Sequence, residues 1–334
     1  MATTWYVATT GNDSTGSGTS GAPYATIGKA VSVAASGDTI AVKSGTYTIT
    51  SNISLTQASL LIQGYQTTPG DGGTKPLVTT ATDTTDIFRT SSNGGVQIWD
   101  NLSISNTASI RLNGILQLSN NGPTLWWVVR NCILDGFITA LNSDNIGSHF
   151  KLGNIAVIHT EIKNCTTSGV VADTGNIYIS GSYLHNNAVH VTNPGSSSGT
   201  NSNTFTRTIF AASTGDGITL NGAVLMSNCV VANNTGKGLA VANTSPFVLL
   251  YNDIFYGNTW GVYMSGAYST GNMESSRNNA WGSNSSGNGS NWTLSASDIT
   301  LTANPFTNAG AGDFSLNSTA GGGAACKNAG LQWG

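Results

Sequence analysis

Six short segments of this chain carry an asparagine at the same place in a repeating pattern, and this ladder constrains the fold most. The intervals between successive ladder asparagines are 33, 22, 42, 24 and 26 residues, and a weaker segment at 207–210 would divide the longest one. A period of this length without helical patterning is typical of a solenoid. Asparagine suits a tight bend because it tolerates left-handed backbone angles, and its amide can bond the asparagine of the next coil. The ladder asparagines are Asn131, Asn164, Asn186, Asn228, Asn252 and Asn278.

The composition favours a packed structure of short strands. Charged residues make up 8% of the chain, against roughly 25% in an ordinary domain. Apolar residues make up 39% and stand in short alternating runs, as in strands with one buried face. Glycine and β-branched residues interrupt nearly every helical window, so we expect no long helix.

Both ends of the chain carry motifs of one fold family. They are Trp-Tyr-Val at 5–7, Gly-Ala-Pro-Tyr at 21–24, Gly-Asp-Thr-Ile at 37–40, Asn-Pro-Phe at 304–306, Gly-Asp-Phe-Ser-Leu at 312–316 and Lys-Asn-Ala-Gly at 327–330. With the ladder, they make nearly the whole chain resemble the right-handed parallel β-helix proteins of the pectate-lyase-like superfamily. The resemblance implies an all-β, single-stranded parallel β-helix. The period predicts about ten to twelve three-strand coils. Because the family includes polysaccharide lyases, glycoside hydrolases, adhesins and phage tail proteins, the resemblance implies a fold rather than one activity.

The sequence predicts one continuous domain, because no charged or proline-rich linker divides it. Its parts are an N-terminal cap and first coil at 1–50, the β-helix coils at 51–280, and a loop with a C-terminal cap at 281–334. Apolar residues at helical spacing between Ile27 and Ala34 predict a short helix that caps the open end of the first coil.

Charge and cysteine content limit the partners and the compartment. A net charge of −3 without a basic cluster argues against nucleic-acid binding. No apolar run is long enough to insert into a membrane. Met1 is followed at once by a polar, strand-like segment, so no signal peptide is visible in the chain. Cys132, Cys165 and Cys229 each follow a ladder asparagine, and we expect free, buried thiols stacked one coil apart.

A stripe of cations is the candidate catalytic site. The residue before the ladder position is Arg130, Lys163, His185, Arg207 or Arg277 in five coils, and Glu161 is expected to face the same way. If the protein is a lyase, Arg130, Glu161 and Lys163 are the candidate catalytic residues, since such enzymes abstract a proton beside a uronate carboxylate. A lyase would also use Ca²⁺, although the aspartates are scattered singly; otherwise we expect no cofactor and no metal. The simpler interpretation is a set of surface ion pairs.

Aromatic side chains form a second candidate surface. Trp126 and Trp127 are adjacent on an expected strand, so one should face the core and the other the solvent. Exposed rings in a shallow groove suit sugar rings, whereas packing under loops or at a subunit contact is the alternative. The candidate glycan-binding residues are Trp126, Tyr183, Tyr251, Trp260 and Tyr263.

These features predict a non-catalytic structural or adhesive β-helix protein of a virion or extracellular assembly. Its expected partners are a polysaccharide or cell-surface glycan, together with sister subunits or other virion proteins. The first alternative is a polysaccharide lyase or glycoside hydrolase that acts in a groove on the β-helix. The second is a secreted bacterial surface protein whose leader is missing from this sequence.

Overall fold

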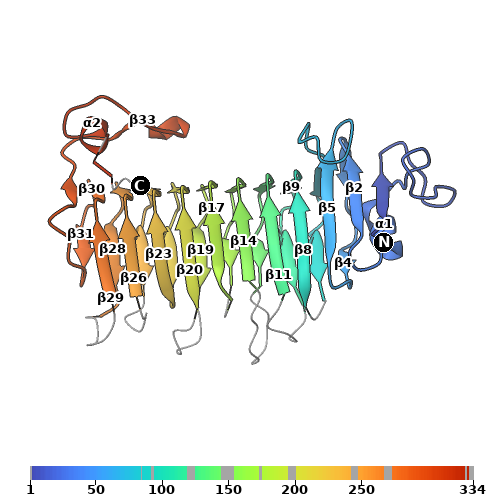
Figure 1. Cartoon of the computed structure of the whole chain (residues 1–334), viewed down its shortest axis with the longest axis horizontal. Coiled ribbons are helices and arrows are strands. Elements are labelled where there is room, and N and C mark those ends of the chain that lie inside the picture. The colour runs from blue at the N-terminus through green and yellow to red at the C-terminus, as the bar shows by residue number, and fades with distance from the viewer. Residues whose placement is uncertain are drawn as a thin grey trace. The chain divides into compact units, whose positions relative to one another are not determined.

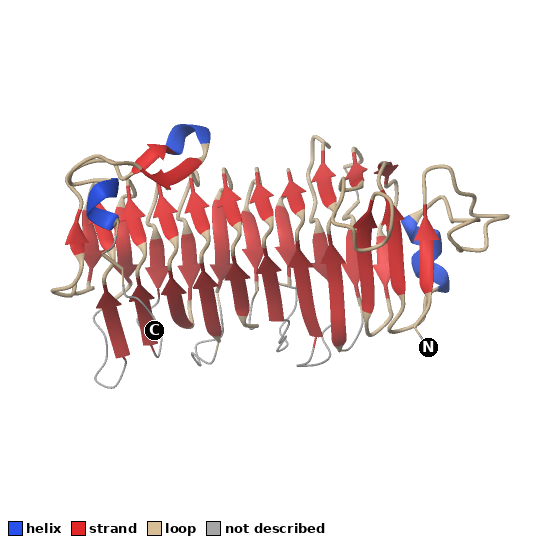
Figure 2. Ribbon diagram, turned by 45° about the horizontal axis from the view of Figure 1, so that its top comes forward, coloured by secondary structure: helices blue, strands red, loops and turns tan. Residues whose placement is uncertain are grey.

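The chain folds into a right-handed parallel β-helix, as the sequence predicted. Its strands form three parallel sheets of 11, 10 and 11 strands, which agrees with the expected number of coils (Figures 1 and 2). The computed structural model describes residues 2–83, 85–91, 94–118, 125–143, 154–172, 175–194, 201–241, 247–266, 273–327 and 329–330. We call the sheets 1, 2 and 3 in the order in which each coil passes through them, and the bends after sheets 1 and 2 the first and second turns.

The contacts divide the chain into two compact units, Met1–Ile177 and Tyr178–Gly334. This boundary falls among the coils. The division of the chain at 50 and 280 stays a prediction. In the first unit, sheet 1 contains β1 (Thr4–Val7), β2 (Thr39–Lys43), β5 (Leu60–Tyr65), β8 (Gly95–Asp100), β11 (Leu125–Arg130) and β14 (Asn154–Ile158). Sheet 2 contains β3 (Thr46–Thr48), β6 (Leu77–Thr80), β9 (Ser103–Asn106), β12 (Ile133–Asp135) and β15 (Glu161–Lys163). Sheet 3 contains β4 (Ile53–Leu55), β7 (Phe88–Thr90), β10 (Ile115–Gln117), β13 (Thr139–Asn142) and β16 (Ser168–Val171).

The second unit repeats the pattern, with β17 (Ile177–Ser180) beginning at the boundary. Sheet 1 continues with β20 (Ser202–Thr206), β23 (Ala223–Ser227), β26 (Phe247–Tyr251) and β29 (Met273–Arg277). Sheet 2 contains β18 (Tyr183–His185), β21 (Ile209–Ala211), β24 (Val230–Ala232), β27 (Ile254–Tyr256), β30 (Ala280–Gly282) and β32 (Ile299–Thr300). Sheet 3 contains β19 (Val189–Asn193), β22 (Ile218–Leu220), β25 (Leu239–Val241), β28 (Trp260–Met264) and β31 (Gly287–Ser290).

Alternating side chains fill the inside of the coils, because successive residues of a strand point to opposite faces. Trp127 is 1% exposed and packs edge-on against Trp99 of the preceding coil, with ring centroids 6.1 Å apart. In the second unit, Phe255 and Trp281 stack at 4.6 Å with an interplanar angle of 8°. Trp126 points outward, which confirms the predicted division of this tryptophan pair.

The first turn holds one left-handed residue in every coil from β8 onward. These residues are Asn101, Asn131, His159, Gly181, Arg207, Asn228, Asn252 and Asn278, with φ between 47° and 59°. The left-handed geometry that the sequence predicted for ladder asparagines is therefore confirmed, and so is the place of the 207–210 segment in the long interval. The positions recur every 21 to 30 residues, because each is one coil after the last.

The six ladder asparagines occupy two different turns, and the prediction of one common place is wrong. Asn164 and Asn186 lie in the second turn, beside left-handed residues such as Asn233, Gly257 and Ser283 of later coils. The two turns have similar local sequences because both bend a strand sharply with one left-handed residue. The motif alone therefore did not distinguish them.

Amide-to-amide bonds between coils come mainly from asparagines outside the predicted ladder. Of the predicted six, Asn252 and Asn228 share such a bond, at 3.4 Å, within the part of the chain that the structure describes. Asn258, which follows the left-handed Gly257, is buried and accepts from the Nδ2 of Asn234 at 2.9 Å. Its own Nδ2 donates to Val231 O and to Asn284 Oδ1. Each amide thus closes a turn and ties it to a neighbouring coil.

The cysteines are free, and those after ladder positions are buried, as predicted, but they do not form one stack. Cys132 and Cys229 lie in the first turn and Cys165 in the second. Burial raises the pKa of the Cys132 and Cys165 thiols to about 12. All three behave as small core residues rather than as reactive thiols.

Both units carry covering elements. In the first unit, α1 (Ile27–Val33) is the predicted capping helix; it buries Ile27, Ala30 and Val31, and Thr26 caps its N-terminus by accepting from Lys29 N at 3.1 Å. In the second unit, the region predicted as a loop from 281 instead contributes β31 and β32 to the coils. The chain then forms an antiparallel hairpin, β33 (Phe306–Asn308) and β34 (Asp313–Leu316), around the 3₁₀ helix η1 (Ala309–Ala311), followed by α2 (Gly323–Cys326).

This C-terminal hairpin covers the outward face of sheet 2 in the second unit. Phe306 and Phe314 form a cluster with the outward-facing Ala211 and Ala232. Tyr183, Ile209, Val230, Ile254 and Tyr256 pack around the cluster. An outward sheet face that would otherwise expose apolar side chains is therefore covered by the hairpin.

We expect Asn258→Ala to destabilise the protein by about 3 kcal/mol, because it leaves several buried backbone and amide groups unpaired. Urea unfolding measures the change. Thr204→Ala, on the outward face of β20, is the control and should stay within about 0.5 kcal/mol of the parent. Equal unfolding midpoints for the two variants would show that the buried amides contribute little.

Candidate functional site

The predicted stripe of cations does not exist as one row. Arg130 and Arg277 end strands of sheet 1, Lys163 and His185 end strands of sheet 2, and Arg207 is itself the left-handed turn residue. The prediction failed for the same reason as the single ladder: residues of the second turn were assigned to the first turn. Arg130 therefore lies on a different sheet from Glu161 and Lys163.

Glu161 and Lys163 form a surface ion pair on β15. Lys163 Nζ lies 3.0 Å from Glu161 Oε1, and both side chains are about three-quarters buried by their surroundings, with 26% and 29% exposed. Their strand pairs with β12, so Lys163 lies beside Asp135 in register. This arrangement matches the simpler interpretation given for the stripe, a surface ion pair.

Arg130 instead borders a polar cleft of about 300 Å³ in the first unit. The cleft opens where the strands of sheet 1 end and the first turn begins. Its wall comes from three successive coils and from the β5–β6 loop, residues 66–76. The lining residues are Gln63, Gly64, Gly70, Gly72, Lys75, Asp100, Asn101 and Asn131.

Asp100 is the hub of the cleft. Its Oδ2 accepts from Gln63 Nε2 at 3.1 Å and pairs with Arg130 Nη2 at 3.0 Å, while its Oδ1 accepts from Asn131 Nδ2 at 2.9 Å. Burial acts to raise the pKa of Asp100, but the hydrogen bonds from Asn131, Gln63 and Arg130 outweigh it and hold the pKa below its usual range. Asp100 is therefore a fixed anion that orients its three partners, not a proton donor at neutral pH.

Two cationic groups of the cleft retain binding capacity. Lys75 Nζ donates to the neutral Asn101 Oδ1 at 2.9 Å, and within the described chain it pairs with no carboxylate. Arg130 lies beside the cleft, its Nη2 is paired with Asp100, and its side chain is 41% exposed, whereas its Nε is buried. A bound anion would therefore pair with Lys75 Nζ and could reach Arg130 only through the exposed part of the guanidinium.

An apolar shelf extends from the cleft along the outward face of sheet 1. Val96 and Trp126 are adjacent in register and are 38% and 40% exposed. Ile98 and Val128 pair between them and the row formed by Asp100 and Arg130. Arg130 comes four residues after Trp126, a distance of about 13 Å along a strand. The shelf and the cleft together form one surface with an apolar part and a charged part.

The other predicted aromatic residues do not belong to this surface. Tyr183 stacks on His185 at 4.0 Å and packs against Phe314, so the C-terminal hairpin covers it, as the packing alternative anticipated. Tyr263 faces outward on β28, as predicted, but Lys237 Nζ lies 4.4 Å above its ring and Trp260 lies 6.4 Å away. Tyr251 ends β26 and pairs in register with Arg277. Among the five predicted aromatic residues, Trp126 has an exposed ring on the strand that ends at Arg130 beside the cleft.

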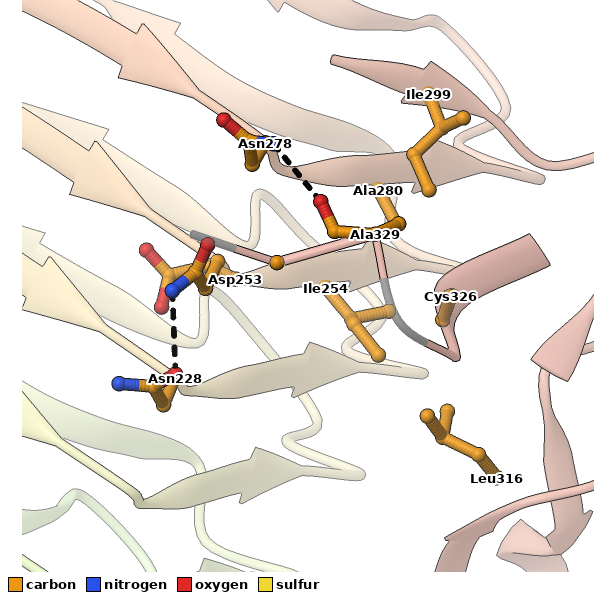
Figure 3. A pocket seen from close by; sticks show the side chains of 11 residues that line it. Asn228, Asp253, Ile254, Asn278, Ala280, Ile299, Leu316, Cys326 and Ala329 are labelled. Atoms are coloured by element: carbon orange, nitrogen blue, oxygen red, sulfur yellow. Dashed lines mark hydrogen bonds between the residues drawn. The ribbon is translucent and has the colours of Figure 1, made fainter. Parts of the chain in front are cut away.

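A second pocket, of about 310 Å³, lies in the second unit between the first turn and the C-terminal segment (Figure 3). Asn228, Asn252 and Asn278 line one side, and Asn278 Nδ2 donates to Ala329 O at 2.8 Å. Asp253 follows in the turn and is fully buried; its oxygens accept from Cys229 N at 2.7 Å and Tyr251 N at 3.1 Å. The chain's own end thus fills part of the space along these asparagines.

Burial raises the pKa of Asp253 well above its ordinary value, and the two backbone hydrogen bonds only partly offset this. No cation lies against the carboxyl group among the described residues. The group therefore keeps its proton in the folded protein at pH values where an exposed aspartate is ionised.

Within the described ranges, no three His, Cys, Asp or Glu side chains gather as ligands for a metal ion. Calcium stays a prediction attached to the lyase alternative. The described helices are all too short to cross a bilayer.

The comparisons with known proteins give the fold. No protein-family model and no curated protein matches the chain. Among solved structures, the pectate lyase Pel9A is similar at 15% identity over 92% of this chain and 83% of its own, with a TM-score of 0.57. A rhamnogalacturonan lyase is also similar, at 12% identity over 83% of this chain and 87% of its own, with a TM-score of 0.40. The periplasmic alginate epimerase AlgG is similar at 15% identity over 78% of this chain and 75% of its own, with a TM-score of 0.37. The chain is thus a right-handed parallel β-helix protein of pectate-lyase-like fold.

Sequence reasoning found Arg130, Asn131 and Trp126 of this surface but missed Gln63, Lys75 and Asp100. Lys75 lies in an irregular loop, and no period assigned it to a turn. Asn101 carried the missing signal: Asp-Asn at 100–101 precedes an apolar residue as Arg-Asn does at 130–131. Adding it to the ladder would have placed Asp100 one coil before Arg130.

We expect Asp253→Asn to change the pH dependence of stability. Above about pH 4 the unfolded chain loses the Asp253 proton while the folded protein keeps it, so the parent loses up to about 1.4 kcal/mol of stability per pH unit as the pH rises toward the folded pKa. The variant has no such proton. Urea unfolding from pH 4 to 8 should therefore show the variant gaining stability relative to the parent; parallel pH profiles would contradict a protonated Asp253.

Proposed function

We propose that this protein binds an acidic polysaccharide on the outward face of sheet 1 in the first unit, as an adhesive or structural β-helix protein. The polar cleft would hold a carboxylate and hydroxyl groups of the polymer. The apolar shelf would support the faces of its sugar rings. The extracellular or virion setting, and contacts with sister subunits or other virion proteins, remain part of this proposal.

The observation that carries the proposal is Lys75, a cleft lysine that is paired with no carboxylate among the described residues and is held in place by Asn101. Arg130, whose side chain is 41% exposed beside the cleft, adds a second positive charge, although its Nη2 is already paired with Asp100. A uronate carboxylate would pair with Lys75 and be attracted by Arg130 without displacing the Arg130–Asp100 pair. The similarity to a pectate lyase supports the choice of pectate as the first probe.

A lyase is the second candidate, because Lys75 and Arg130 are the pair of groups such chemistry needs. Lys75, in its uncharged form, would take the proton from the carbon next to the uronate carboxylate, while the guanidinium of Arg130 stabilises the negative charge that develops there. The bond to the leaving glycosidic oxygen then breaks as a double bond forms in the sugar, and the leaving oxygen takes up a proton from the protonated lysine or from water. Asp100 would act only by positioning Arg130. Absorbance of the unsaturated product, with and without Ca²⁺, tests this candidate.

We expect pectate or alginate in the gel to slow the migration of the protein in affinity electrophoresis. A neutral glucan should leave the migration unchanged. Lys75→Ala should weaken the binding of pectate by about tenfold or more, because a charge-assisted bond is lost. Lys163→Ala is the matched control: it removes the same charge from the surface pair with Glu161 and should bind as the parent does. If the parent binds neither pectate nor alginate, the proposal is refuted. If the two variants lose affinity equally, the cleft has no special role.

Trp126→Ala should weaken the same binding by roughly three- to tenfold, since the loss of one stacking aromatic surface is worth about 0.5–1.5 kcal/mol. Ile110→Ala is the control, because Ile110 is also an exposed apolar residue of the first unit and lies outside the shelf. Fluorescence titration of the tryptophans with pectate measures both. Unchanged affinity of the Trp126 variant would remove the shelf from the binding surface.

A further inference from the structure

We infer that the cleft binds the end of a polysaccharide chain and not its interior. This inference rests on the proposed function and specifies the form of the ligand. Its basis is the β5–β6 loop, which lies across the side of the cleft formed by the earlier coils. The loop leaves a polymer no continuous path over that side.

The loop is an insertion at the first turn. Eleven residues connect β5 to β6, from 66 to 76, whereas two residues, Asn101 and Leu102, connect β8 to β9. Later coils also use two residues, such as Asn131 and Cys132. In Figure 1 the loop projects beyond the ends of β5 and β2. The first turn is therefore short after β8 and β11, whereas after β5 it is a long loop that projects outward.

The loop folds back over the row of residues that a bound polymer would follow. Gln63, Asp100 and Arg130 lie side by side in register on β5, β8 and β11. Gly70 of the loop sits over the Gln63 end of this row, and a Cβ built on Gly70 would lie 3.8 Å from Gln63 Nε2. A chain that enters over Arg130 and passes Asp100 therefore meets the loop at Gln63.

The β5–β6 loop forms an end wall of the cleft at Gln63, and hydrogen bonds hold this wall in place. Within the loop, the Asp71 carboxylate accepts from the backbone N–H groups of Gln66, Thr67, Thr68 and Gly73. These bonds, chiefly those from Thr67 and Gly73, hold the pKa of Asp71 below its usual range.

Asn101 ties the loop to the first turn of the next coil. Its Nδ2 donates to Gly64 O at 3.1 Å and to Gly73 O at 3.2 Å, while its Oδ1 accepts from Lys75. A Cβ at Gly64 would collide with the carbonyl oxygen of Asn101, so glycine permits this close approach. The cation that recognises the ligand and the wall that stops it are thus held by one side chain.

The native protein tests the inference directly. Size-fractionated pectate, in short and long fractions, is titrated calorimetrically, and the number of protein molecules bound per chain is measured. End binding predicts one protein molecule per chain in every fraction, because only one of the two chemically different ends fits the wall. Binding per unit mass of pectate should then rise as the chains become shorter.

A loop variant gives the converse result. Deletion of residues 67–73 removes the wall and keeps Lys75, and it joins Gln66 to Thr74, whose backbone N–H already donates to Gln66 Oε1. The variant should place more than one protein molecule on each long chain. Asp71→Ala, which loosens the loop without shortening it, is the second variant if the deletion does not fold, and it should shift the stoichiometry in the same direction.

The outcomes separate the inference from the proposed function. If the native protein binds long pectate with a stoichiometry that grows with chain length, the inference is overturned and polysaccharide binding stands. If it binds neither short nor long pectate, both fail. One molecule per chain for the native protein in all fractions, rising on long chains when the loop is deleted, supports end recognition.

Discussion

The structure depends on bending a backbone sharply in every coil without leaving polar groups unpaired. A strand that ends in a tight turn exposes N–H and C=O groups that neighbouring strands cannot reach. In this chain a left-handed residue makes the bend, and a buried polar side chain beside it satisfies the turn of the neighbouring coil. Asparagine serves both needs, since it tolerates the angle and offers a donor and an acceptor. The scarcity of charge follows, because an uncharged amide is cheaper to bury than an ion.

The use of one residue type for every sharp bend also explains which features the sequence could predict. The fold, the capping helix, the free cysteines and the inward and outward tryptophans all followed from repetition and alternation, which are local properties. The assignment of Asn164 and Asn186 to the same turn as Asn131 failed, because both turns use the same backbone solution and therefore the same residue. The asparagine motif therefore predicts that the chain bends at that residue, but not whether the bend is the first or the second turn of the coil. The predicted stripe of Arg130, Lys163 and His185 failed for the same reason.

The cleft was only partly accessible to sequence reasoning. Arg130 and Trp126 lie on a regular strand, where the period places them. Lys75 arrives from an insertion, and its position is set by Asn101 of another coil and by the bonds around Asp71. No pattern in the sequence carries that information. Regular coils thus supply the rows of side chains, while the one long departure from the two-residue turn supplies the three-dimensional shape of the site.

The hairpin that covers sheet 2 of the second unit also orders events in time. It is made of the last part of the chain, yet the apolar residues it buries, such as Tyr183 and Ile209, lie more than ninety residues earlier in the sequence. During synthesis those coils emerge long before their cover, so their outer face stays open to water and to other chains until the hairpin residues arrive. A chain released before residue 306 would keep that apolar face of sheet 2 exposed. The hairpin therefore protects, from a distance in sequence, coils that are made long before it.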